Sequence, residues 1–213
     1  MELTKFTHSC VRLDDGDRTL VLDPGSFSEL DEALDGADAV FVTHEHIDHL
    51  EPDRLRTALS ADSRLRLYAP APVAEMFGEF GEQVETVETG QSYEVAGFPV
   101  RTFGGQHAVI HPTIPVIANV AAFVADTVYH PGDSLIVPPV DVPVLLAPMH
   151  APWSKTSEVI DFVVGVRAPK VTGIHDALLI PPGLAMVEGH VGRLGGEHGS
   201  EFVHLSPRET LTV

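Results

Sequence analysis

The stretch Phe41–Leu50, FVTHEHIDHL, places three histidines, one glutamate and one aspartate within six consecutive positions, directly after an apolar run. The apolar run predicts a strand, and Pro52 predicts the start of a helix soon afterwards. Two of the histidines, His44 and His46, are two residues apart, so they face the same side while the chain is still extended. Asp48 and His49 follow in the turn. This spacing favours a metal site over a solvent-facing polar loop.

A helical zinc-protease motif, H-E-x-x-H, is the alternative interpretation of the same stretch, because HEHID begins in the same way. Asp48 stands where that motif requires its second histidine. The preceding residues AVFV are also typical of a strand rather than of a helix. The sequence therefore disfavours the helical motif.

The overall composition limits the classes of protein that fit. A length of 213 residues with 44% hydrophobic content predicts one compact domain over residues 1–213. No segment approaches the roughly 18 apolar residues of a membrane span, and the N-terminus lacks a basic region followed by an apolar one, so we expect a cytoplasmic protein without membrane association. The net charge of −18 disfavours nucleic acid as a partner. The single cysteine, Cys10, is expected to be a buried strand thiol.

The order of predicted elements indicates the fold class. Strands are expected first, then alternating strands and helices, and this order occurs twice along the chain. It predicts an α+β fold in which two mixed sheets face each other with helices outside. The expected strands cover residues 2–9, 10–15, 19–25, 37–42, 65–70, 84–90, 91–97, 98–105, 117–134, 142–148, 170–175 and 201–206, and the expected helices cover residues 52–60, 72–80, 157–166 and 183–194.

The spacing His-x-His-x-Asp-His at His44, His46, Asp48 and His49 resembles the signature of the metallo-β-lactamase superfamily. FTHSCVRLD and TLVLDPG resemble the opening strands of its lactonase-like branch, the relatives of L-ascorbate-6-phosphate lactonase, and YHPGDS resembles its Gly-Asp-Ser/Thr segment. The resemblance covers most of the chain and weakens after Leu184. It implies a four-layer αββα sandwich of two mixed β-sheets, the metallo-β-lactamase fold.

The same resemblance implies two metal ions. The first two histidines of the motif and a later histidine would hold one ion, the motif's aspartate and last histidine would hold the second with a C-terminal histidine, and a separate aspartate would bridge both. From its sequence neighbours alone, Asp133 fits a turn residue as well as a metal ligand. For His175 the alternative to a metal ligand is a core histidine at a strand end. The implied ligands are His44, His46, Asp48, His49, His107, Asp133 and His175.

Two residues of GGQHAVIH compete for the middle position. His107 is preferred because it follows an expected strand and the Gly104–Gly105 turn, as the family pattern has it. His111 precedes Pro112 in a less defined loop.

A second group of residues is expected near the substrate. The candidates for lining the pocket are His8, His111, His150 and Trp153. For His8 a hydrogen-bonded strand histidine is an equal alternative, and for Trp153 packing under a loop is the alternative. Asp176 is a candidate to orient a metal ligand. His130, His190, His198 and His204 are expected to be structural or surface residues.

The chemistry implied by these residues is hydrolysis. Imidazole and carboxylate donors suit two divalent metal ions, with zinc expected first and manganese or iron as alternatives. A metal-bound hydroxide would attack a small ester, lactone or phosphodiester, with Asp48 and Asp133 as catalytic residues. The segment GDS lacks the G-x-S-x-G elbow of serine hydrolases. An iron-dependent oxidoreductase and a non-catalytic metal-binding or ligand-binding protein are the other hypotheses.

Overall fold

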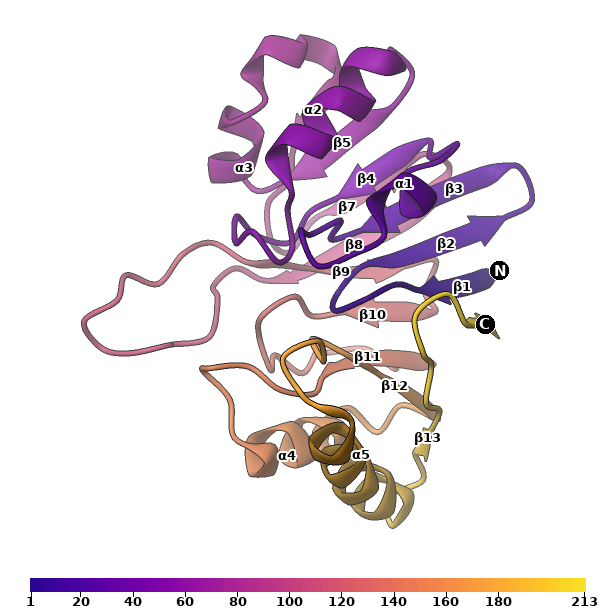
Figure 1. Ribbon diagram of the computed structural model, residues 1–213, viewed down its shortest axis with the longest axis vertical. Coiled ribbons are helices and arrows are strands. Elements are labelled where there is room, and N and C mark those ends of the chain that lie inside the picture. The colour runs from indigo at the N-terminus through magenta and orange to yellow at the C-terminus, as the bar shows by residue number, and fades with distance from the viewer.

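The computed structural model describes residues 1–213 and contains two seven-stranded mixed β-sheets. The strand order is β14-β1-β2-β3-β4-β5-β6 in the first sheet and β13-β12-β11-β10-β9-β8-β7 in the second. The two sheets lie face to face, and helices cover both outer faces (Figure 1). The predicted four-layer αββα sandwich is confirmed.

The first sheet begins antiparallel and continues parallel, because β1, β2 and β3 pair as neighbouring hairpins and the chain then alternates strand with helix. Its helices pack on one face, where 15 buried apolar residues form a cluster. The elements are β1 (Glu2–Lys5), β2 (Val11–Asp15), β3 (Arg18–Leu22), α1 (Leu30–Ala33), β4 (Ala39–Phe41), α2 (Pro52–Ala61), β5 (Arg66–Ala69), α3 (Ala71–Glu75), the 3₁₀-helix η1 (Gly78–Gln83), β6 (Val84–Thr86) and β14 (Thr210–Thr212).

The second sheet repeats this arrangement with two longer helices on its outer face (Figure 1). Strands β7 to β10 are antiparallel to their neighbours, and β10 to β13 are parallel. The elements are β7 (Ser92–Val95), β8 (Phe98–Gly104), β9 (Val120–Val124), β10 (Val128–His130), β11 (Val144–Pro148), α4 (Thr156–Val166), β12 (Lys170–Ile174), α5 (Pro181–Gly196) and β13 (Glu201–Phe202).

The inner core fills the space between the sheets with 20 buried apolar residues. Strand alternation explains which side chains reach it, since Leu20 and Leu22 of β3 face the opposite sheet. Val21, between them, instead packs under the helices. None of the helices combines the length and the apolar composition needed to cross a membrane.

Four local features of the structure differ from the expectations. The strand expected over residues 117–134 is divided into the antiparallel strands β9 and β10, with a turn at residues 125–127. The helix expected over residues 72–80 is divided, because α3 ends at Glu75 and a 3₁₀ segment follows in which Gly81 has a non-helical φ of 54°. The strand expected over residues 201–206 has only two residues, Glu201 and Phe202. Helix α1 was not expected from the sequence, since four residues are too few to show a helical period.

The strand directions gather several strand ends at one edge of the sandwich. In the second sheet, β8 and β10 are both antiparallel to β9, and β12 runs parallel to β10 through β11. Their carboxyl ends therefore lie at the same edge. In the first sheet, the same reasoning aligns the ends of β1, β3 and β4. Each of these six strands leads into a residue of the site described below.

The Pro24–Gly25 turn after β3 holds the histidine-rich loop in place. The N–H of Ser26 donates to the carbonyl oxygen of Ile47 at 2.8 Å, and the N–H of Glu51 donates to the carbonyl oxygen of Pro24 at 3.0 Å. A Cβ on Gly25 would overlap the main-chain carbonyl of Asp48. Glycine at this position therefore lets the two loops approach.

Replacement of this glycine, Gly25→Ala, should displace the loop and lower the affinity for divalent metal by at least about 10-fold, the loss seen when the support of a metal ligand is removed. Isothermal titration with Zn²⁺ measures the change. Gly189→Ala is the control, because nothing lies near that exposed helical glycine. It should keep the metal affinity and raise the free energy of unfolding by about 0.5–1 kcal/mol. Equal metal affinities in the two variants would contradict this account of Gly25.

Candidate metal centre

The side chains that follow these strands form two adjoining groups of metal-binding type. One group contains His44, His46, His107 and Asp133, and the other contains His8, Asp48, His49 and His175. Within each group, the candidate ligand atoms all lie within 4.8 Å of one another. The structure thus brings together all seven residues of the expected ligand set, together with His8.

Several of these groups are buried without any hydrogen-bond partner. They are the Nε2 atoms of His44, His49 and His175 and the Oδ1 atom of Asp133. Buried polar atoms nearly always have a partner, so four such atoms in one place require an explanation. A cation supplies one, because these atoms lie close together and each can offer it a lone pair once His49 has lost its Nε2 proton. The donors are nitrogen and oxygen without thiolate, which fits divalent metal ions such as Zn²⁺, Mn²⁺ or Fe²⁺.

Asp133 lies between the two groups. Its Oδ1 is 2.9 Å from Nε2 of His49. Its Oδ2 is 3.2 Å from Nε2 of His107 and 3.2 Å from Nε2 of His175. One carboxylate therefore reaches histidines of both groups, which is the geometry expected of a bridging ligand.

The electrostatics favour an ionised Asp133. Burial alone would raise its pKa, but the charge of His49 and the close contacts of His107 and His175 outweigh burial and hold the pKa well below its usual range. Burial lowers the pKa of His44 well below its ordinary value, and His49 adds to this effect. At neutral pH His44 is thus uncharged, the state in which an imidazole nitrogen can bind a metal.

The outer nitrogen of each of three histidines is fixed by a main-chain or hydroxyl oxygen. Nδ1 of His107 donates to the carbonyl oxygen of Ala108 at 2.6 Å. Nδ1 of His175 donates to the carbonyl oxygen of His150, also at 2.6 Å. Nδ1 of His44 lies 3.0 Å from Oγ1 of Thr43. These contacts turn each Nε2 towards the centre, as outer partners do in known metal sites.

Asp23 performs this role for His49 and was missed from the sequence. This fully buried carboxylate lies 2.6 Å from Nδ1 of His49 and accepts hydrogen bonds from the N–H and the hydroxyl of Thr43, each at 2.7 Å. In the sequence, LDPG reads as a turn, which accounts for the omission. The position of Asp23 directly after an apolar strand was the feature of the sequence that could have indicated its role.

His8 is buried beneath the second group rather than exposed to a substrate. Its Nδ1 accepts the main-chain N–H of Ala177 at 3.3 Å, which leaves the proton on Nε2. That Nε2–H donates to Oδ2 of Asp48 at 3.1 Å. His8 therefore orients Asp48 and has no free lone pair for a metal. Burial would raise the pKa of Asp48, but His8, His49 and His175 together lower it to about 2.

A cavity of about 310 Å³ opens onto the centre. Four residues were expected to line it, and three of them, His8, His111 and His150, do not. His8 is covered, so it does not reach the cavity. His111 is exposed on its loop, where Nδ1 is 2.7 Å from Oγ1 of Thr113, and it does not line the wall. His150 contributes its main-chain carbonyl to His175 instead of its side chain to the cavity. Trp153 does line the cavity, and its Nε1 donates to Oδ2 of Asp133 at 2.8 Å.

Contacts in the structure also show the roles of Asp176 and His130. Asp176, a candidate to orient a metal ligand, instead pairs with Lys5 at 2.9 Å. His130 is structural as expected, because it is buried and its Nε2 donates to the carbonyl oxygen of Ser9 at 2.9 Å.

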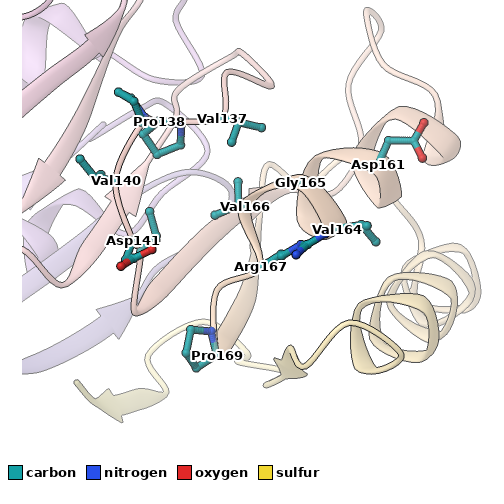
Figure 2. Close-up of a pocket in the computed structure, with 12 residues that line it drawn as sticks. Val137, Pro138, Val140, Asp141, Asp161, Val164, Gly165, Val166, Arg167 and Pro169 are labelled. Atoms are coloured by element: carbon teal, nitrogen blue, oxygen red, sulfur yellow. The ribbon is translucent and has the colours of Figure 1, made fainter.

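A larger depression, of about 850 Å³, lies between residues 137–142 and the end of α4 (Figure 2). Its polar side chains are Asp141, Asp161 and Arg167, without a histidine. It offers neither the donor set nor the unpaired buried atoms of the first site. The chemistry of this chain therefore belongs to the smaller cavity.

Metal binding should release protons, because the two carboxylates beside His49 favour its protonated form in the metal-free protein. Burial lowers its pKa, but Asp133 and Asp23 outweigh burial and raise the pKa well above its ordinary value. The Nε2 proton must leave before a metal binds, so affinity should rise with pH until the raised pKa is passed. We expect about one proton released per loaded protein at pH 7. Zinc titration calorimetry in buffers of different ionisation enthalpy measures this number, and identical heats in all buffers would contradict it.

The assignment of His107 can be tested against its neighbour. His107→Ala should lose at least one of two bound metals, since its Nε2 points at Asp133, whereas His111→Ala should keep both. Metal analysis after gel filtration gives the stoichiometry. Retention by the first variant and loss by the second would reverse the assignment.

Comparison with known proteins identifies the family of this chain. A sequence profile of the beta-lactamase superfamily domain matches residues 2–175. Protein Rv0786c of Mycobacterium tuberculosis is 39% identical over 217 residues, which cover 100% of both chains. A UPF0173 metal-dependent hydrolase of Xanthobacter autotrophicus is 26% identical and covers 90% of this chain and 84% of its own length.

Two solved structures share the fold. Igni18, a metallo hydrolase from Ignicoccus hospitalis, has a TM-score of 0.76 at 19% identity and covers 99% of this chain and 97% of its own. CmlA, a diiron β-hydroxylase from Streptomyces venezuelae, has a TM-score of 0.73 at 14% identity, covering 100% of this chain and 54% of its own. The profile match over residues 2–175, together with the fold, shows that this chain belongs to the metallo-β-lactamase superfamily.

Proposed function

We propose that this protein is a dinuclear metal-dependent hydrolase of a small ester, lactone or phosphodiester. The observation that carries the proposal is the set of unpaired buried ligand atoms around Asp133. Membership of the superfamily and similarity to a metal-dependent hydrolase support it. On the basis of the sequence, we also propose that the protein belongs to the lactonase-like branch of the superfamily. We propose in addition that it is cytoplasmic and acts on a small molecule.

In this proposal each group would hold one divalent ion. The first ion would be held by His44, His46 and His107. The second would be held by Asp48, His49 and His175. Asp133 would contribute to both sites, since its two oxygens face histidines of each group. Zinc is the ion proposed first, and manganese or iron suits the same donors.

Bound divalent ions would lower the pKa of a water molecule and polarise the carbonyl or phosphoryl oxygen of the substrate. The chain's own residues position these partners. Asp48 stays ionised at neutral pH because its pKa is about 2, and His8 fixes its orientation. Trp153 donates to Asp133 and forms part of the cavity wall, so it limits the approach of solvent to the bridging carboxylate.

A serine nucleophile is not needed and does not fit. The hydroxyl of Ser134, in the GDS segment, is buried and donates to the carbonyl oxygen of Pro131 at 3.0 Å. Its proton is engaged with the main chain instead of a catalytic base. Hydrolysis by an activated water is therefore the better account of this site.

An iron-dependent oxidoreductase is the second candidate function, because the diiron β-hydroxylase CmlA shares this fold and nitrogen and oxygen donors also accept iron. Metal analysis of protein purified without added metal separates the two. An assay panel of esters, lactones, thioesters and phosphodiesters should then show hydrolysis that chelation abolishes and zinc restores. Two iron ions per chain with no hydrolysis of any class would favour the oxidoreductase.

Asp133→Asn should lose at least one metal and reduce hydrolysis by more than roughly 100-fold, because even outer partners of metal ligands contribute about 10–100-fold. Asparagine keeps the shape but removes the charge that offsets the repulsion between two cations. Asp161→Asn makes the same change in an exposed carboxylate of the other depression and should keep both metals and full activity. Metal content and initial rates are measured side by side. Full metal content and activity in Asp133→Asn would refute the bridging role.

A further inference from the structure

The wall of the catalytic cavity is apolar apart from the metal-binding groups and Trp153. Its large apolar side chains are Phe27, Ile47, Ile110 and Leu178, which are 43%, 60%, 37% and 49% exposed. Exposed apolar side chains gathered around one cavity mark a binding surface, whereas scattered ones carry no such meaning.

These four side chains come from four separate loops. Phe27 follows β3, Ile47 lies within the histidine-rich loop, Ile110 belongs to the loop between β8 and β9, and Leu178 lies between β12 and α5. The loop of Ile110 extends far from the sheets (Figure 1). Their convergence on one cavity is a property of the fold and not of one apolar segment.

The same wall contains no lysine or arginine. Lys155, two residues after Trp153, lies 3.5 Å from Glu158, and Lys5 is paired with Asp176 at 2.9 Å. Bound cations would act on the reacting bond, but a charged group elsewhere on the substrate would meet no opposite charge. The net charge of −18 adds a long-range repulsion of anions.

We propose that the site takes small substrates whose non-reacting part is apolar and uncharged, such as short-chain acyl esters or alkyl lactones, and disfavours sugar phosphates and other substrates with a second anionic group. This inference rests on the proposed hydrolase function and narrows it. The cavity of about 310 Å³ is at the small end of ligand pockets, which span about 300–1,000 Å³.

The reaction for an ester balances without a further reagent. The oxygen of water forms a bond to the acyl carbon, and the bond from that carbon to the alkoxy oxygen breaks. The alkoxy oxygen leaves with one proton as the alcohol, and the new acid loses its proton to solvent. For a lactone, alcohol and acid remain in one molecule.

The direct test uses esters with one reacting group and different tails. Zinc-loaded protein is assayed with p-nitrophenyl acetate, butyrate and hexanoate, and with the p-nitrophenyl monoester of adipic acid, which has the chain length of hexanoate but ends in a carboxylate. We expect kcat/KM to rise by up to about fourfold per methylene buried, and hexanoate to exceed the adipate monoester by at least about 10-fold. An adipate monoester hydrolysed as fast as hexanoate would overturn the proposal.

A charge placed on the wall should change this preference. Leu178→Lys should raise the ratio of adipate monoester to hexanoate hydrolysis by at least about fivefold, through attraction of the tail carboxylate. Met186→Lys adds the same charge on α5 outside the cavity and should leave the ratio unchanged. Equal ratios in both variants would show that Leu178 does not face the substrate tail.

Binding without turnover separates this inference from the proposed function. Trp153 is the only tryptophan and lines the cavity, so its fluorescence reports occupancy. N-hexylacetamide should change the emission of zinc-loaded protein, and 6-acetamidohexanoate, with its anionic end, should do so only at a concentration at least about 10-fold higher. If no ester is hydrolysed but this selectivity holds, the hydrolase function fails and the binding preference stands. If esters are hydrolysed and neither probe is preferred, the inference on the substrate fails.

Discussion

The fold holds several imidazole and carboxylate atoms close together in one buried region, although these atoms lack hydrogen-bond partners. The rest of the structure depends on this arrangement. Without a cation these atoms make no hydrogen bond of good geometry, and a buried polar atom without one costs about 1–3 kcal/mol. The backbone is strained at the same place, because His8, Asp23 and His175 all have positive φ values although none is glycine. Strain and unpaired atoms at one edge are tolerated because two seven-stranded sheets and their cores fix the strand ends there.

The fold and the local half of the site could be predicted from the sequence. His44, His46, Asp48 and His49 are neighbours in the chain, so their spacing was visible without a structure. Asp133, His107 and His175 come from the other sheet, and only a family resemblance pointed to them. Asp23 and the tautomer of His8 could not be predicted, because each depends on a contact across the site, with His49 and with Ala177.

The pocket residues were the weakest sequence predictions for a physical reason. The sequence prediction chose histidines as pocket residues because imidazole can bind metals and substrates. In the structure, His150 contributes its main-chain carbonyl instead, and His111 is exposed on a protruding loop. The residues that do form the wall are ordinary apolar side chains such as Phe27 and Leu178, which in a sequence look like core residues. Only the convergence of the loops distinguishes them.

The central claim is that Asp133 lies between two metal ions. Anomalous diffraction at the zinc absorption edge from crystals of the zinc-loaded protein tests it most directly. The account predicts two peaks roughly 3.5–4 Å apart, one beside His44, His46 and His107 and the other beside Asp48, His49 and His175, with the carboxylate of Asp133 between them. A single peak, or two peaks that Asp133 does not contact, would contradict it.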